Sequence, residues 1–243
     1  GQIVFADNVA TQAARDAGTT GFALRGFDAV GLVASGDIRF AGRGVTSIDN
    51  TGTGGSGHEA QLNIEAGRVT TVGTADHLLT ASGKTSVRGG NTAAGADTGL
   101  GGALELRGRS VEVAALKDSK GNVLKTAGRI EATAGRITLA ATGGDAADGV
   151  SIGEGARIAT EGKRVAFADT AAYADGGTVT LSSTTGSVAV GDGAIVSVSA
   201  TTGGGDAGTL NLIATKGTIE AGAGTLRGQG GTGGAGGQLH ADA

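Results

Sequence analysis

The sequence predicts an all-β protein, a right-handed parallel β-helix (β-solenoid) with three short strands per coil. Three observations favour this fold. Short segments alternate apolar and polar residues along the whole chain, glycines bound nearly all of these segments, and a unit of about thirty residues recurs. The regular alternation of apolar residues argues against disorder, and so does the low net charge of −4.

The alternating segments have the two-residue period of half-buried strands. Each places two apolar side chains on one face and polar side chains on the other. Clear examples are Asp37–Phe40, Gln61–Ile64, Ala103–Leu106, Arg136–Leu139, Thr178–Leu181 and Thr209–Leu212. No window holds a sustained helical stripe with caps at both ends, so we expect almost no helix.

The segments recur as a unit of three. Strands that follow Gly177, Gly186 and Gly193 are repeated in the same order after Gly208, Gly217 and Gly224. A third copy begins at Gly237, after a nearly equal interval. The copies are clearest over residues 175–243. We interpret residues 1–243 as a single β-helix segment. Because the chain has no methionine, we expect this segment to be a fragment of a longer protein.

The expected interior is aliphatic, because aromatic residues make up only 2% of the chain. Glycine at the corners permits positive φ angles, and the absence of proline suits strands that pair on both edges. Parallel crossovers are right-handed. A β-propeller needs four strands per blade, so it fits less well. We expect inward columns of Leu181, Val188, Ile195, Leu210, Leu212, Ile219 and Leu226.

Composition excludes several classes of protein. The mild acidity and the lack of a Lys/Arg block argue against nucleic acid as a partner. No apolar run approaches the ~20 residues of a membrane span, so we expect a chain that is not membrane-spanning. The N-terminal residues Gly1–Phe5 show no signal peptide. Zero cysteine fits export in the unfolded state and also fits many cytosolic proteins.

The repeats resemble the filamentous haemagglutinin type of two-partner secretion exoprotein. The segments that carry the resemblance are Gly205–Leu212, Gly193–Ser199, Gly224–Gly231 and Ala34–Phe40. The resemblance implies secretion to the bacterial cell surface through an outer-membrane β-barrel partner, and roles in adhesion, biofilm or contact-dependent antagonism. The family's secretion domain carries Asn-Pro motifs. This chain has no proline, so it resembles the repeat shaft of an exoprotein.

The sequence predicts no catalytic, cofactor-binding or metal-binding residues. Gly-x-Gly-x-x-Gly matches start at Gly52, Gly203, Gly228 and Gly231, but none opens a helix after a strand, as phosphate binding requires. The segment Gly83–Thr85 resembles the end of a P-loop, but Leu78 stands where the first glycine belongs. We therefore expect no nucleotide cofactor.

Histidines and aspartates are the remaining candidate ligands. His58, His77 and His240 are far apart in sequence, and we interpret them as solvated turn residues. Six aspartates sit in Gly/Ala turns, where they are expected to bond their own backbone, and calcium binding there stays open: Asp145, Asp148, Asp169, Asp175, Asp192 and Asp206.

These observations favour a non-catalytic surface scaffold or adhesin shaft that displays or spaces binding surfaces. An alternative is a polysaccharide-binding or polysaccharide-degrading β-helix, although Tyr173 is the chain's only polar aromatic residue. In a binding module, host-cell or sugar ligands are expected at Thr51–His58 or Gly228–Gly237. We also expect further coils, or another copy, to continue the stack by edge pairing, because neither Gly1–Phe5 nor Gly237–Ala241 forms an evident cap.

Overall fold

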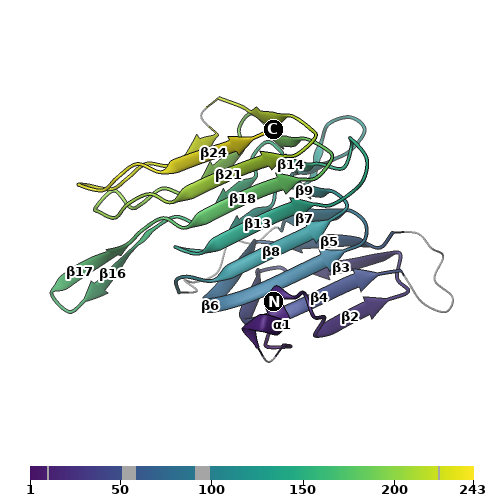
Figure 1. The fold of residues 1–243 in the computed structure, drawn as a ribbon, viewed down its shortest axis with the longest axis horizontal. Coiled ribbons are helices and arrows are strands. Elements are labelled where there is room, and N and C mark those ends of the chain that lie inside the picture. Colours follow the sequence, from purple (N-terminus) through teal and green to yellow (C-terminus); the bar gives the residue numbers. More distant parts are fainter. Residues whose placement is uncertain (10, 51–58, 91–98, 224) are drawn as a thin grey trace.

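A computed structural model describes residues 1–9, 11–50, 59–90, 99–223 and 225–243 of the chain. It confirms the all-β prediction and shows sheets built of parallel strands (Figure 1). One sheet has 13 strands and a second has 7, and two further pairs of strands form separate two-stranded sheets. Within these residues the helical content is a single α-helix, α1 (Gln12–Asp16), and no helix has the length and apolar character needed to cross a membrane.

The parallel strands stack in three rows, which we call rows I, II and III. Row I contains β2 (Phe22–Arg25), the second halves of β4 (Asp37–Asp49) and β6 (Arg68–Ala81), and then β8 (Ala103–Gly108), β13 (Arg136–Ala141), β18 (Thr178–Ser183), β21 (Thr209–Ala214) and β24 (Gln238–Asp242). Row II is the 7-stranded sheet and contains β3 (Ala29–Val33), β5 (Gln61–Ala66), β7 (Thr85–Gly89), β9 (Val111–Val113), β14 (Val150–Ile152), β19 (Val188–Val190) and β22 (Ile219–Ala221).

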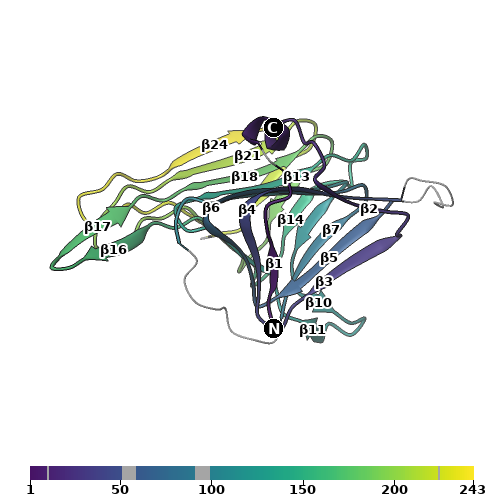
Figure 2. The ribbon, with the colours of Figure 1, turned by 90° about the horizontal axis from the view of Figure 1, so that it is seen from below.

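Row III belongs to the same strongly curved 13-stranded sheet as row I (Figure 2). It contains β1 (Ile3–Phe5), the first halves of β4 and β6, and then β12 (Arg129–Glu131), β15 (Arg157–Ala159), β20 (Ile195–Ser197) and β23 (Leu226–Arg227). In the C-terminal part of the chain, consecutive strands belong to rows I, II and III in turn, and we call one such set of three strands a winding. Strands β18, β19 and β20 occupy rows I, II and III, and β21, β22 and β23 repeat that order.

The repeat period predicted from the glycines is confirmed by the strand register. Thr178 pairs with Thr209 and Val188 with Ile219, so both rows have the offset that separates Gly177 from Gly208. Thr209 pairs with Gln238, which is the offset from Gly208 to Gly237 predicted for the next copy. The spacing of glycines therefore predicted which strands lie side by side.

Two windings near the N-terminus differ from the expected three short strands. Strands β4 and β6 are 13 and 14 residues long, and each runs through row III and bends into row I. Gly42 and Gly73 have φ angles of +70° and +55° at these bends, where a residue with a Cβ would be strained. The pairing of the two strands also shifts register between Ala41 and Arg43.

The corner glycines have two roles. Gly193 has a φ angle of +74°, as expected for a corner glycine, whereas the glycines that precede the strands of rows I and II have a different role. A Cβ on Gly208 would lie 1.7 Å from the carbonyl oxygen of Gly177, and a Cβ on Gly217 would lie 2.3 Å from that of Gly186. None of these four glycines has a positive φ angle. Close approach of the backbones in successive windings, and not backbone conformation, thus requires glycine at these corners.

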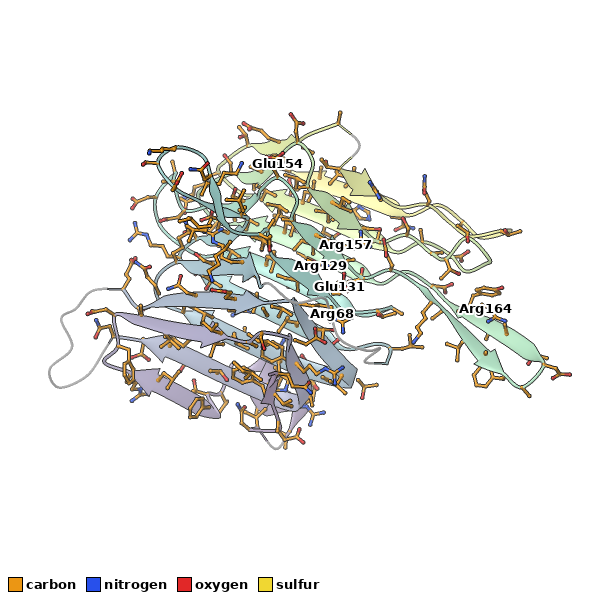
Figure 3. All side chains as sticks on the ribbon, turned by 180° about the vertical axis from the view of Figure 1, so that it is seen from behind. Arg68, Arg129, Glu131, Glu154, Arg157 and Arg164 are labelled. Carbon is orange, nitrogen blue, oxygen red and sulfur yellow. The ribbon has the colours of Figure 1, made fainter. Side chains whose placement is uncertain are left out.

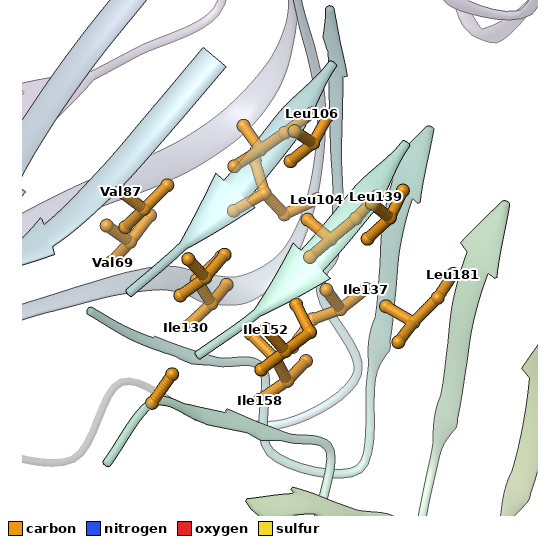
Figure 4. Packing of buried hydrophobic residues seen from close by; sticks show 14 of the residues in the cluster. Val69, Val87, Leu104, Leu106, Ile130, Ile137, Leu139, Ile152, Ile158 and Leu181 are labelled. Carbon is orange, nitrogen blue, oxygen red and sulfur yellow. The ribbon is translucent and has the colours of Figure 1, made fainter. Parts of the chain in front are cut away.

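One aliphatic core extends through all three rows, from Ala34 to Ala214 (Figure 4). The predicted inward residues Leu181, Val188, Leu210 and Leu212 are buried, and Ile219 and Leu226 are partly buried against the core. The prediction for Ile195 was wrong. Its neighbours Ala194, Val196 and Val198 are buried in the core instead. Ile195 shares its alternation frame with Ser197 and Ser199, whereas Ala194, Val196 and Val198 form an apolar frame, so the alternation itself favoured the frame that faces inward.

Two antiparallel hairpins interrupt the windings. Strands β10 (Leu116–Lys117) and β11 (Val123–Lys125) form a short one. Strands β16 (Lys163–Phe167) and β17 (Thr170–Ala174) form a longer one that projects from the rows (Figures 1 and 2). Neither was predicted. Exposed apolar side chains mark both hairpins, among them Val123, Leu124 and Phe167.

Helix α1 packs against β4 and β6 on the outside of row I. Thr11 caps its N-terminus and accepts a hydrogen bond from the backbone N–H of Ala14. Arg15 is buried and forms ion pairs with Asp76 (2.8 Å) and Glu105 (3.4 Å). These pairs join the N-terminal segment to two successive windings.

A candidate functional site: a charged trough on row III

Three arginines stack in register on the outer face of row III. Val69, Ile130 and Ile158 pair across β6, β12 and β15 and face the core, so the preceding residues Arg68, Arg129 and Arg157 face outward on three neighbouring strands (Figure 3). Neighbouring parallel strands lie only ~4.8 Å apart. Like charges stacked this closely repel each other and require compensation.

Glu131 is the carboxylate that the three arginines share. Its Oε1 lies 2.7 Å from Nη2 of Arg129 and 3.4 Å from Nε of Arg157, and its Oε2 lies 3.5 Å from Nη1 of Arg68. The carboxylate thus contacts all three guanidinium groups. Asp37 adds a second acceptor for Arg68, at 2.8 Å. Most side chains of this cluster are largely shielded from solvent, namely Arg68, Arg157, Glu131 and Asp37. Their ion pairs are therefore stronger than ion pairs between exposed side chains.

Arg129 and Arg157 line a groove of about 570 Å³. Glu161 stands at its far end, where it bonds Nη2 of Arg157 at 2.5 Å and accepts a hydrogen bond from the hydroxyl of Ser197 at 2.6 Å. Lys163, the first residue of β16, lines the groove as well. Ile195 also lies here, in register with Arg157, which explains why it is absent from the core.

A second groove of about 630 Å³ continues the first towards row II. The two share Arg129 and Gly155, and together we call them the trough. The lining of the second groove is more apolar and includes Ala115, Val123 and Ala127. Hairpin β10–β11 therefore borders one end of the trough, and hairpin β16–β17 begins at the other.

A separate ion-pair cluster joins row I to row II. Arg109 contacts Asp148 through two oxygens at 2.8 and 3.0 Å, and it also contacts Glu59 and Asp145. The hydrogen bond from Arg109 holds the pKa of Asp148 below its usual value, and the hydrogen bond to Asp148 raises the pKa of Arg109. Each of the three guanidinium nitrogens of Arg109 forms an ion pair with a carboxylate. We therefore assign Arg109 a structural role.

The histidines occupy different environments, and the expectation for His77 was wrong. His77 is fully buried in β6, with its ring 5.3 Å from that of Phe40, and its Nε2 donates to the carbonyl oxygen of Ala41 at 2.8 Å. Burial lowers its pKa. A Cβ on Gly44 would lie 2.4 Å from the imidazole, so glycine there makes room for the ring. His240 is exposed on β24, and His58 lies outside the described residues.

Asp148 bonds the backbone of its own turn, as expected, whereas Asp175 and Asp206 bond backbone groups of another turn. Oδ1 of Asp175 accepts from the N–H of Asp206 at 2.7 Å, and Oδ1 of Asp206 accepts from the N–H of Ala235 at 2.7 Å. Each carboxylate thus links one winding to the next. Asp148 is buried and also accepts from the N–H of Asp145. Asp169 and Asp192 lie in exposed turns. Over the residues that the structure covers, no group of three His, Cys, Asp or Glu side chains could hold a metal ion.

The glycine motifs lie in loops or at strand ends. Thr85 begins a strand and not a helix, so the segment Gly83–Thr85 does not form a phosphate-binding turn. The segment Gly228–Gly237 forms a loop that bonds the loop of the preceding winding, through the N–H of Gly231 to Gly205 and the N–H of Thr232 to Thr202. The predicted loop Thr51–His58, which includes the match at Gly52, lies outside the described residues.

The chain matches no protein-family model, and no curated protein or solved structure matches it either. Sequence reasoning missed the trough, although one signal was present. An arginine stands directly before an inward aliphatic residue in Arg68-Val69, Arg129-Ile130 and Arg157-Ile158. The interval from Arg68 to Arg129 is more than twice the interval from Arg129 to Arg157, so the three arginines do not repeat at a fixed spacing.

Proposed function

We propose that the three rows form a right-handed parallel β-helix. The rotation of strands through rows I, II and III, with the same register offset in rows I and II, supports this fold. The preferred hand of parallel crossovers supports the right-handed form. Each winding then adds about 4.8 Å, so the eight strands of row I extend about 35 Å from first to last.

We propose further that the protein is a non-catalytic scaffold at a bacterial cell surface, of the filamentous haemagglutinin type. The observation that carries this proposal is the continuous stacking of short, glycine-bounded windings around one aliphatic core. Such an array is stiff along its axis and can space binding surfaces, because each winding is held by its neighbours. In this proposal an outer-membrane β-barrel partner exports the chain, and the hairpins and loops present contacts to host cells, to sugars or to other copies.

Surface location tests the scaffold proposal. Antibodies against the chain should label intact cells of the bacterium that encodes it, and external protease should remove the signal. Loss of the cognate outer-membrane transporter should abolish labelling while a control outer-membrane protein stays labelled. Labelling that requires cell lysis would contradict the proposal.

A polysaccharide-binding or polysaccharide-degrading protein is the second candidate, and the trough is the observation that favours it. Glu131 and Glu161 both line the charged groove, and glycoside hydrolysis uses a pair of carboxylates. Both, however, form ion pairs with Arg157. Incubation with acidic and neutral polysaccharides separates the two functions. Release of reducing ends that Glu161→Gln abolishes would favour the enzyme over the scaffold.

A further inference from the structure

We propose that the trough on row III binds an extended polypeptide segment rich in Asp and Glu, with Arg129 as the principal recognition residue. The proposal is independent of where the protein is located. It rests on the charge of the trough, on the state of Arg129, and on the shape and lining of the two grooves.

The trough is positively charged on an acidic protein. The cations that line it are Lys117, Arg129, Arg157 and Lys163, and the carboxylates are Glu131, Glu154 and Glu161. The formal charges of these lining side chains sum to +1, whereas the whole chain has a net charge of −4. A concave surface of this kind concentrates the field and attracts anionic ligands.

The guanidinium group of Arg129 has N–H donors that are available to a ligand. Its Nη2 bonds Glu131, and within the described residues its other guanidinium nitrogens make no hydrogen bond. The side chain is 46% exposed, compared with 11% for Arg68 and 24% for Arg157. Arg129 also belongs to both grooves, so it stands at the centre of the trough. A planar guanidinium with vacant donors suits bidentate binding of a carboxylate.

The shape of the trough suits an extended chain. Its first groove is lined by β12 and by Thr133 just beyond it, and by residues from Gly155 to Glu161 that include β15, so it follows the direction of the strands. The second groove offers apolar contacts from Val123 and Ala127 for side chains of the ligand. Polypeptides bind proteins in this way, with alternate side chains directed into pockets.

The lining favours a polypeptide over a sugar chain. None of the described residues that line the two grooves is aromatic, and sugar rings commonly stack on aromatic side chains. Nucleic acid is disfavoured for the same reason, because single strands use aromatic platforms as well as cations.

Binding of a fluorescein-labelled peptide of ten glutamates, followed by fluorescence anisotropy, tests the proposal. The wild-type protein should bind the peptide, and the affinity should fall as salt is added. Arg129→Gln should weaken binding about tenfold, the effect of losing one charge-assisted hydrogen-bond pair. Arg129→Lys keeps the charge without the planar fork and should bind with intermediate affinity.

Arg227→Gln is the matched control, because Arg227 is an exposed arginine of row III that does not line the trough. It should leave the affinity within about twofold of wild type, since only long-range attraction is lost. Unchanged melting temperatures of the Arg129 variants establish that they fold. No binding of the peptide, equal losses for Arg129→Gln and Arg227→Gln, or tighter Arg129-dependent binding of polygalacturonate would each overturn the proposal.

Discussion

Nδ2 of Asn211 donates a hydrogen bond of 3.2 Å to Oγ1 of Thr180, the residue that lies 31 positions earlier and directly beside it in row I. The same offset joins the hydroxyls of Ser187 and Thr218 at 3.0 Å near row II. Polar side chains therefore follow the period of the backbone. Pairs of this kind stabilise one register over its alternatives, because a shift of one residue would turn each partner to the other face.

Replacement of Leu212 by Asp tests the inward register of row I. Leu212 is 2% exposed and belongs to the core, so the variant buries an unpaired charge. We expect a loss of several kcal/mol in the free energy of unfolding, measured by urea titration. Asn211→Asp is the control at the adjacent outward position and should cost under about 1 kcal/mol. Equal losses for the two variants would show that the assigned register is wrong.

Replacement of Glu131 by Gln tests the compensation of the stacked arginines. The change removes the negative charge that contacts Arg68, Arg129 and Arg157, and we expect a loss of about 1–3 kcal/mol in the free energy of unfolding. Glu154→Gln is the control, because Glu154 is 75% exposed and pairs only with Lys117 among the described residues. It should change stability by less than about 0.5 kcal/mol. A similar small effect for Glu131→Gln would contradict the role of Glu131.

The stability of the protein should depend on the protonation of His77. Burial lowers the pKa of this imidazole in the folded state, so the unfolded chain takes up a proton first as the pH falls. Stability from this source is present above about pH 6.5 and is lost as the pH drops below that value. His77→Leu should flatten the fall in melting temperature between about pH 6.5 and pH 5. His240→Leu, a change at an exposed site, should keep the wild-type profile.

Replacement of Gly208 by Ala tests the packing role of the corner glycines. The new methyl group would lie 1.7 Å from the carbonyl oxygen of Gly177, so two windings must separate. We expect a loss of more than about 2 kcal/mol in the free energy of unfolding. Gly31→Ala is the control, since Gly31 is exposed and a Cβ there meets no atom within 4 Å. A tolerated Gly208→Ala together with a damaging Gly31→Ala would refute this account of the corners.

The sequence predicted the general fold because alternation and glycine spacing are local signals that repeat. The pairings of Thr178 with Thr209 and of Val188 with Ile219 follow directly from the interval between equivalent glycines. The alternation favoured the correct frame at Ile195, because Ala194, Val196 and Val198 are apolar and Ser197 and Ser199 are not. Local patterns were insufficient where a strand bends through two rows, as in β4 and β6.

The candidate site was not predictable from the same signals. Ile130 pairs with Val69 on one side and with Ile158 on the other, and the first partner is more than twice as distant in sequence as the second. The arginines that precede these residues therefore have no constant period. The reason is that β12 pairs directly with β6 in row III, whereas β8 lies between β6 and β13 in row I. The burial of His77 was not predictable from local patterns either. It depends on Gly44, its partner on the neighbouring strand, which has no side chain to occupy the position of the imidazole.

The most direct test of the stacked windings is an engineered disulfide between Thr180→Cys and Asn211→Cys. The chain has no cysteine, so this pair cannot mispair with a native thiol. Register partners on neighbouring strands lie about 4.8 Å apart, within the range that a disulfide spans. The pair Thr180→Cys and Thr209→Cys is displaced along the strand and lies about 8 Å apart, beyond that range. After mild oxidation, mass spectrometry should show an intramolecular disulfide in the first variant and free thiols in the second. Free thiols in the first variant, or oxidation of both variants to the same extent, would contradict the parallel register on which the fold, the trough and the proposed function depend.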